Sequence, residues 1–245
     1  IDYIVADPYL IFDDEKNLYT EKIVRLPNIW NCHSGIKFNE EVKEPPFLKN
    51  DYITFGCFNN SIKITDETIL VWSKILLEKK YSKIIIKASS EDAEIAQKSI
   101  LKKFESLNVK ASRVLFSKRN KDKSDHYKMY NKVDISLDTF PYPGVTTSME
   151  SIWMGVPVLT LNGNNFVSRC GASINLNLGM PELIAETKNE YIEKALTLSN
   201  DKNKLIEIRK LLRKKALNSP LFDTKKFGQQ FYEMLDDIWS TYSSK

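Results

Sequence analysis

The sequence has few cysteines, no long apolar run and none of the common short catalytic motifs. Its three cysteines, Cys32, Cys57 and Cys170, are widely spaced and form no CxxC pair. This spacing argues against a metal site and indicates reduced thiols in a cytoplasmic protein. No stretch approaches ~20 apolar residues, so we expect no transmembrane helix and no membrane partner. There is also no GxGxxG, no Walker lysine and no Ser/His/Asp set.

The charge is nearly balanced, which argues against a nucleic-acid partner. The 36 Lys and Arg residues against 32 Asp and Glu residues give a net charge of +4, spread along the chain. Nucleic-acid binding domains instead concentrate basic residues in one stripe. The hydrophobic content of 42% is sufficient for a sizeable core. The 245 residues suit one domain plus part of a neighbour, and the opening on Ile1 without a signal peptide suggests a piece of a longer protein.

Residues 134–161 contain the pattern around which the rest of the chain is organised. Residues 134–140 alternate apolar and polar side chains as a strand does, and Pro141, Pro143 and Gly144 then break the strand. Three hydroxyls that can cap a helix follow, before an apolar helix that ends at Gly155 and a short strand at residues 156–161. This is a βαβ unit whose helix N-terminus can receive an anion such as phosphate. Hydroxyls at helix starts are also frequent as simple caps.

Strands and helices alternate over the rest of the chain. Strand patterns occur at residues 52–58, 83–87 and 114–116, with further short strands at 1–5, 23–26 and 181–185. Helical patterns occur at residues 65–79, 90–107, 124–130, 166–177, 188–198, 202–218 and 224–242. The alternation predicts an α/β fold with a Rossmann-like, doubly wound parallel sheet. The loops after Phe58, Phe116 and Phe140 then share the rim where such sheets bind ligands.

Few titratable side chains fall near that rim. They are Lys63, Lys123, His126 and Glu150. A lysine beside a helix N-terminus suits a diphosphate, and a carboxylate one turn further can accept hydrogen bonds from ribose hydroxyls. Three of them also have a plainer explanation: a surface charge for Lys63, a helix-start residue for His126 and a solvated face for Glu150. Spacing alone therefore suggests nucleotide binding and leaves a structural α/β domain open.

Several motifs resemble one family in the family's own order. The segments are FGCFNNSIKITDETILVWSKIL, DISLDTFPYPGVTTSMESIWMGVPVLTL, NNFVSRCGASINLNLGMPELIA and SPLFDTKKFGQQFYEMLDDIW. They look like the catalytic region of O-GlcNAc transferases and SPINDLY-like proteins. The opening, DYIVADPYLI with YTEKIVRLPN, resembles the end of the preceding catalytic half. The resemblance covers residues 2–239, almost the whole chain.

The resemblance implies a C-terminal, donor-binding lobe of a GT-B glycosyltransferase. Residues 1–48 would be the end of the N-terminal catalytic lobe and a linker, residues 49–218 the nucleotide-sugar-binding lobe, and residues 219–245 a helix that crosses back. The expected partners are a nucleotide sugar, a protein or peptide acceptor, the N-terminal catalytic lobe and tetratricopeptide repeats. The expected reaction is inverting, metal-independent transfer to Ser or Thr hydroxyls, with UDP-GlcNAc as donor substrate and no cofactor.

The resemblance also assigns the phosphate contacts. Lys63 matches the lysine that contacts the donor diphosphate and stabilises the leaving group, so it is the expected catalytic residue. Asn60 stands where O-GlcNAc transferases carry a glutamine near the phosphates. Thr146 and Thr147 match the two phosphate-binding threonines. Val145 departs from the pattern, because many members have histidine there in a His-Thr-Thr run.

The nucleoside contacts follow from the same comparison. Lys123 and His126 match residues that line the base and uridine pocket, and Glu150 replaces an aspartate that faces the ribose. The loop between Phe116 and His126 is one residue longer than in the family, so residues 119–121 receive no role. These departures leave GDP-fucose or UDP-glucose as alternative donors, and a non-catalytic nucleotide-sugar-binding fragment as an alternative function. If the other lobe is absent, apolar surface on the helix at residues 224–242 should remain partly uncovered.

Overall fold

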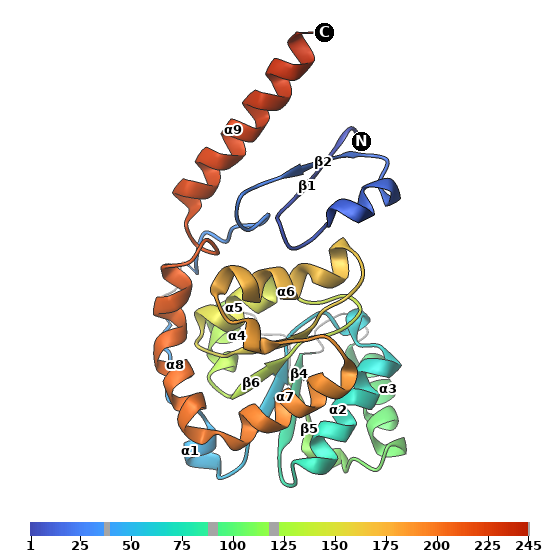
Figure 1. Ribbon diagram of the computed structural model, residues 1–245. Helices are drawn as coiled ribbons and strands as arrows, with labels where there is room; N and C mark the ends of the chain where they lie inside the picture. The colour runs from blue at the N-terminus through green and yellow to red at the C-terminus, as the bar shows by residue number, and fades with distance from the viewer. Residues whose placement is uncertain (37–39, 88–92, 118–122, 245) are drawn as a thin grey trace.

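Six parallel strands form the central sheet of the protein (Figure 1). The computed structural model describes residues 1–36, 40–87, 93–117 and 123–244, except for the Lys123 side chain. The strands are β3 (Thr54–Cys57), β4 (Lys83–Lys87), β5 (Val114–Ser117), β6 (Ile135–Leu137), β7 (Val158–Leu161) and β8 (Ile184–Ala185). Their spatial order is β5-β4-β3-β6-β7-β8, and every neighbouring pair is parallel. The predicted doubly wound parallel sheet is confirmed.

The chain reverses its direction of travel across the sheet between β3 and β6. From β3 it proceeds to β4 and β5, and it then returns to place β6 on the other side of β3, where Phe55 pairs with Ile135. A parallel sheet opens a crevice beyond its carboxyl ends at such a switch point. The ends of β3 and β6 are therefore where this fold is best able to hold a ligand.

Helices cover both faces of the sheet (Figure 1). On β4, Ile84 and Ile86 join the larger apolar cluster with Trp72 of α2, whereas Ile85 belongs to a second cluster with Tyr130 of α4. Alternate residues of a strand face opposite sides, so β4 is buried on both. The helices are α1 (Phe47–Asn50), α2 (Asp66–Glu78), α3 (Ala93–Ser106), α4 (Lys123–Tyr130), α5 (Thr146–Trp153), α6 (Phe166–Leu178), α7 (Lys188–Asn200), α8 (Lys202–Leu217) and α9 (Thr224–Ser243).

The N-terminal segment forms a small separate sheet that packs on α6 (Figure 1). Its parallel strands are β1 (Tyr3–Ala6) and β2 (Lys22–Arg25), joined through the 3-10 helix η1 (Asp13–Leu18). The buried carboxylate of Asp7 accepts a hydrogen bond from Ser173 Oγ at 2.5 Å. Arg169 donates from its two terminal nitrogens to the Glu15 carboxylate at 2.5 and 2.7 Å. Polar contacts therefore hold this segment against α6 alongside the apolar ones.

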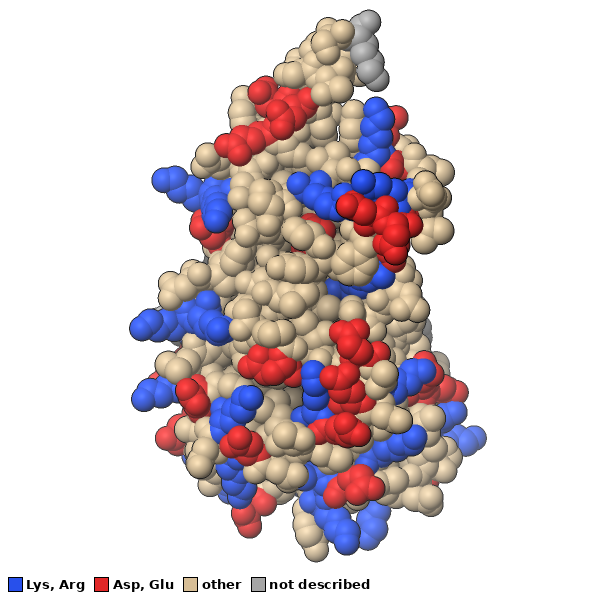
Figure 2. Space-filling view, viewed as in Figure 1, with Lys and Arg blue, Asp and Glu red and all other residues tan. Residues whose placement is uncertain are grey.

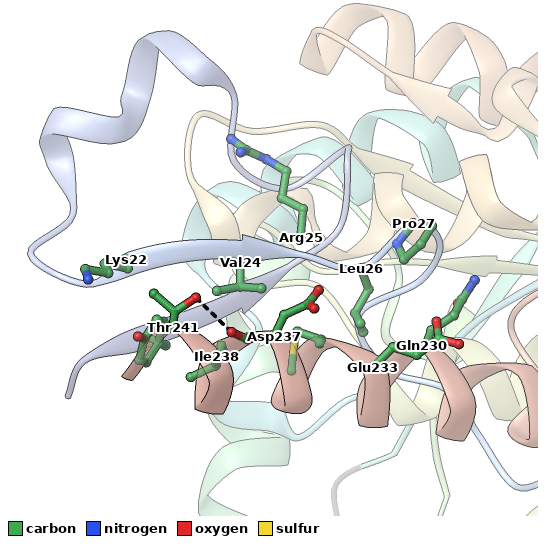
Figure 3. Close-up of a pocket in the computed structure, with 12 residues that line it drawn as sticks. Lys22, Val24, Arg25, Leu26, Pro27, Gln230, Glu233, Asp237, Ile238 and Thr241 are labelled. Atoms are coloured by element: carbon green, nitrogen blue, oxygen red, sulfur yellow. Dashed lines mark hydrogen bonds between the residues drawn. The ribbon is translucent and has the colours of Figure 1, made fainter. Parts of the chain in front are cut away.

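Helix α9 extends away from the large sheet and runs beside β2 (Figure 1). A groove of about 410 Å³ lies between them, with Val24 and Leu26 on the strand side and Ile238 on the helix side (Figure 3). On the outer part of α9, Leu235 is 47% and Trp239 65% exposed. The expectation that apolar surface of this helix is partly uncovered is confirmed.

Basic and acidic side chains lie side by side over the face of the molecule seen in Figure 2, without a large area of one sign. Mixed surfaces of this kind are typical of solvated α/β domains. Among the described residues, no helix is both long and apolar enough to span a bilayer.

Candidate functional site

Two buried polar residues meet where β3 and β6 end. Asn59 follows β3 and Asp138 follows β6, and the Asn59 amide donates to Asp138 Oδ1 at 2.9 Å. The same amide nitrogen donates to Thr139 Oγ1 at 2.8 Å. Because the carboxyl ends of neighbouring parallel strands lie at one edge, residues 79 positions apart come into contact here.

The Asp138 carboxylate fixes the loop that leads into α5. Its Oδ1 accepts hydrogen bonds from the backbone N–H groups of Thr139 at 2.9 Å and Gly144 at 2.7 Å, and its Oδ2 accepts one from Thr160 Oγ1 at 3.0 Å. Burial raises the pKa of Asp138 to about 6, although these hydrogen bonds act in the opposite direction. The carboxylate therefore serves mainly as a hydrogen-bond acceptor for the loop.

Helix α5 begins one residue earlier than a hydroxyl cap would place it. Its N-cap is Val145, which makes no side-chain capping hydrogen bond, and Thr146 is already the first helical residue. The expectation that Thr146, Thr147 or Ser148 caps the helix is wrong. The bond from Gly144 N–H to Asp138 turns the chain before the hydroxyls are reached, and Val145 packs against the apolar clusters instead. No side chain covers the N-terminal N–H groups of α5 within the described residues, and such groups favour an anion.

Lys63 lies against the same loop. It ends the 3-10 helix η2 (Ser61–Lys63), and its Nζ donates to the Pro143 carbonyl at 2.9 Å. The ammonium group also lies 3.7 Å from the centre of the Tyr142 ring. Partial burial lowers the pKa of Lys63, while the Asp138 carboxylate opposes that shift. The structure thus brings Lys63 to the loop immediately before α5.

The two asparagines after β3 have different positions. The Asn60 side chain is exposed, and its Oδ1 accepts a hydrogen bond from the backbone N–H of Ile62 at 3.2 Å, which caps η2. The Asn59 side chain is buried, and its Oδ1 accepts a hydrogen bond from the Thr147 hydroxyl. Thr146, by contrast, is exposed on the first turn of α5. Asn59 therefore joins the candidate site, and Asn60 lies at its edge.

A second hydrogen-bonded group surrounds His126 on α4. Its Nε2 lies 3.0 Å from Glu150 Oε2, and its Nδ1 lies 3.3 Å from Lys87 Nζ. A lysine ammonium can only donate, so Nδ1 accepts from Lys87 and Nε2 carries the proton that Glu150 accepts. The Tyr130 hydroxyl also donates to Glu150 Oε2, at 3.0 Å. The structure therefore brings together His126 and Glu150, which the sequence placed separately.

The His126 group is connected to the start of α5. Tyr130 OH lies 3.3 Å from the Thr147 carbonyl and 3.0 Å from Glu150. Burial by itself raises the pKa of Glu150, but the hydrogen bonds from His126 and Tyr130 and the charge of Lys87 bring it below its usual value. The carboxylate is thus held in its ionised, accepting form beside the start of α5.

Part of the expected nucleoside pocket falls outside the described residues. Lys123 begins α4, but its side chain is outside that description, as are residues 119–121. Sequence reasoning missed Asn59, Asp138 and Tyr130 as members of the site. Part of the signal for the first two was available, because both are polar residues that lie just beyond the ends of neighbouring buried strands.

Comparisons with known proteins show which family the chain resembles. Residues 42–231 match the family model described as Glycosyl transferase family 41. The chain is 34% identical over 242 residues to a Solanum lycopersicum protein named probable UDP-N-acetylglucosamine–peptide N-acetylglucosaminyltransferase SPINDLY. That match covers 99% of this chain and 26% of the relative. The chain therefore spans about a quarter of the length of such relatives.

A nematode protein and a bacterial structure extend the comparison. The Caenorhabditis elegans UDP-N-acetylglucosamine–peptide N-acetylglucosaminyltransferase is 30% identical over 198 residues, which covers 80% of this chain and 17% of that protein. A solved structure of a mutant Thermobaculum terrenum O-GlcNAc transferase superposes with a TM-score of 0.85 and 30% identity. It matches 99% of this chain, and the match covers 46% of that chain.

Proposed function

The chain belongs to glycosyltransferase family 41, and from that membership we propose that it is the C-terminal, donor-binding lobe of an enzyme that transfers a sugar to Ser or Thr hydroxyls of proteins. One observation carries the proposal: Lys63 and the uncapped start of α5 meet on the loop beyond β3 and β6. A cation and a helix N-terminus at a switch point both favour binding of a diphosphate.

The donor's diphosphate would lie against the first turn of α5. Thr146 and Thr147 belong to that turn, and Lys63 is held within reach by the Pro143 carbonyl and the Tyr142 ring. These two contacts are with neutral groups. A diphosphate would offer its ammonium a charge-assisted partner, which is the stronger interaction.

The nucleoside would lie on the side of α4. There Glu150 can accept hydrogen bonds from ribose hydroxyls, because its pKa is held low. His126, whose ring nitrogens are engaged by Lys87 and Glu150, would present its ring to the base. The assignments of Asn60 at the phosphates and Lys123 at the base belong to the same proposal.

The proposed reaction displaces the nucleoside diphosphate with inversion at the sugar carbon. Departure of the diphosphate develops negative charge, which the Lys63 ammonium and the N–H groups of α5 would stabilise without a metal ion. Preorganised donors of this kind are among the largest contributors to catalysis. Loss of one such donor costs on the order of 10²–10³ in rate.

The names of the relatives favour UDP-GlcNAc as donor and a peptide as acceptor. In this proposal residues 1–48 are the end of the N-terminal catalytic lobe with a linker, residues 49–218 the donor-binding lobe, and residues 219–245 the crossing helix. The whole enzyme would require the remainder of the N-terminal lobe to supply the acceptor site.

Calorimetric titration of the chain with UDP and GDP tests the proposal. We expect UDP to bind, and Lys63→Ala to weaken it at least about tenfold, because a charge-assisted hydrogen bond is lost. Lys74→Ala is the matched control, since Lys74 is an exposed residue on the face of α2 and should leave binding unchanged. Preference for GDP would move the donor to a guanosine sugar such as GDP-fucose. Unchanged affinity in Lys63→Ala would refute the role of Lys63.

A further inference from the structure

A chain of three hydrogen-bonded side chains connects β6, β3 and α5. The Asn59 amide nitrogen donates to Asp138 Oδ1 and Thr139 Oγ1, and this orientation turns its carbonyl oxygen toward Thr147. Thr139 cannot reverse the arrangement, because its own proton goes to the Tyr142 carbonyl at 2.7 Å. The direction of every hydrogen bond in the chain is therefore fixed.

The Thr147 hydroxyl is committed by this arrangement. A hydroxyl has one proton, and Thr147 gives it to Asn59 Oδ1. It is therefore not available to a phosphate while that bond is intact. The hydrogen bond from Thr147 to Asn59 instead holds the first turn of α5 against the end of β3.

The loop packs directly on the same atoms. A methyl group on Gly144 would lie 2.5 Å from Asn59 Oδ1 and would overlap the Thr147 hydroxyl. The Gly144 backbone N–H meanwhile donates to Asp138 Oδ1 at 2.7 Å. Loop, helix start and strand end are thus in contact at one point, and movement of any of them displaces the others.

We propose that Asn59 and Asp138 are positioning residues that hold the start of α5 in the orientation that binds the donor diphosphate, with Thr147 as their link to the helix. Neither residue needs to touch the donor: the N–H groups of the first turn and Lys63 do so. This inference rests on the proposed function, and it adds two residues to that function and gives Thr147 an indirect role.

Four variants of the chain, titrated calorimetrically with UDP, test the inference. Asn59→Ala and Thr147→Val each break the link, and we expect UDP affinity to fall on the order of tenfold, the value of one net hydrogen bond. Thr147→Ser restores the hydroxyl and should recover most of the affinity. Thermal unfolding of each variant confirms that it folds.

Thr160→Val is the matched control for a merely structural role. Thr160 donates to Oδ2 of the same Asp138 carboxylate, on the side away from the loop contacts made by Oδ1. Loss of the Thr160 hydroxyl should reduce thermal stability and leave UDP affinity unchanged. A structural role alone would make Asn59→Ala and Thr160→Val indistinguishable in UDP affinity.

The outcomes separate this inference from the function on which it rests. Wild-type binding of UDP that is weakened by Asn59→Ala and Thr147→Val, but not by Thr160→Val, supports both. Wild-type binding with unchanged or tighter binding in Asn59→Ala overturns the positioning role and leaves the proposed function standing. A folded wild-type chain that binds neither UDP nor GDP overturns the proposed function and the inference with it.

Discussion

Two helical glycines should respond to alanine substitution in opposite directions. Gly171 lies in α6, and a methyl group there would overlap Thr160 Oγ1 and lie 2.9 Å from Asp138 Oδ2. Gly228 lies in α9, and a methyl group there would meet nothing within 4 Å. Both substitutions improve helix propensity, so the surroundings alone decide the sign of the change in stability.

The magnitudes follow from those surroundings. At Gly228, alanine removes the entropic disadvantage of glycine and should stabilise the chain by about 0.5–1 kcal/mol. At Gly171 the overlap of the added methyl group with Thr160 outweighs the same gain, because α6 lies between the sheet and the N-terminal segment and cannot move away from Thr160. Overpacking costs about 1–3 kcal/mol, and the bond from Thr160 to Asp138 is disturbed as well. We expect a net destabilisation of about 1–3 kcal/mol.

Urea unfolding of the wild-type chain and the two variants measures both effects. The chain's four tryptophans provide a fluorescence signal, and circular dichroism reports the helices independently. Gly171→Ala should lower the midpoint, and Gly228→Ala should raise it. If Gly171→Ala is as stable as the wild type, α6 has room to move from β7, and the close packing around Asp138 is refuted.

Two further predictions concern charge. Burial raises the pKa of Asp134 and of Asp138 to about 6. Between pH ~4 and 6 the native state therefore binds more protons than the unfolded state. The free energy of unfolding should consequently be larger at pH 5 than at pH 7, by about 1 kcal/mol for each carboxyl. Urea unfolding at the two pH values checks this, and the difference should shrink in Asp134→Asn. Arg169→Lys keeps the charge but loses the bidentate contact with Glu15, so residues around η1 should become more sensitive to limited proteolysis. Resistance to proteolysis equal to that of the wild type would mean that apolar contacts alone hold the N-terminal segment.

Much of the fold was predictable because its elements have clear local signals. The helix from Asp66 begins after a threonine cap, and Gly155 ends α5 with a left-handed backbone at φ 72°. Strand β4 is a run of three isoleucines between lysines, and its bounds agree with the pattern. These elements were predicted because propensity, capping and periodicity agree at each of them.

The details of the site were less predictable because they depend on contacts distant in sequence. Nothing local distinguishes Asn59 from Asn60, and only the position of Asp138 at the end of the neighbouring strand β6 selects Asn59. The hydroxyls near Thr146 satisfy the local rule for a cap, but the bond from the Gly144 N–H to the buried carboxylate of Asp138 sets where α5 begins. Tertiary contacts here override a capping preference worth about 1 kcal/mol.

The position of the site at the strand-order switch has a consequence for how the chain folds. The contact between Asn59 and Asp138 joins residues 79 positions apart, so it closes a long loop that includes β4, α3, β5 and α4. Long-range parallel pairing is entropically slow, and local helices form much faster. The contact between Asn59 and Asp138, and with it the proposed donor site, should therefore form late, when β6 docks beside β3. The proposed binding of UDP, followed during refolding, would then report the docking of β6 rather than the gradual gain of helix.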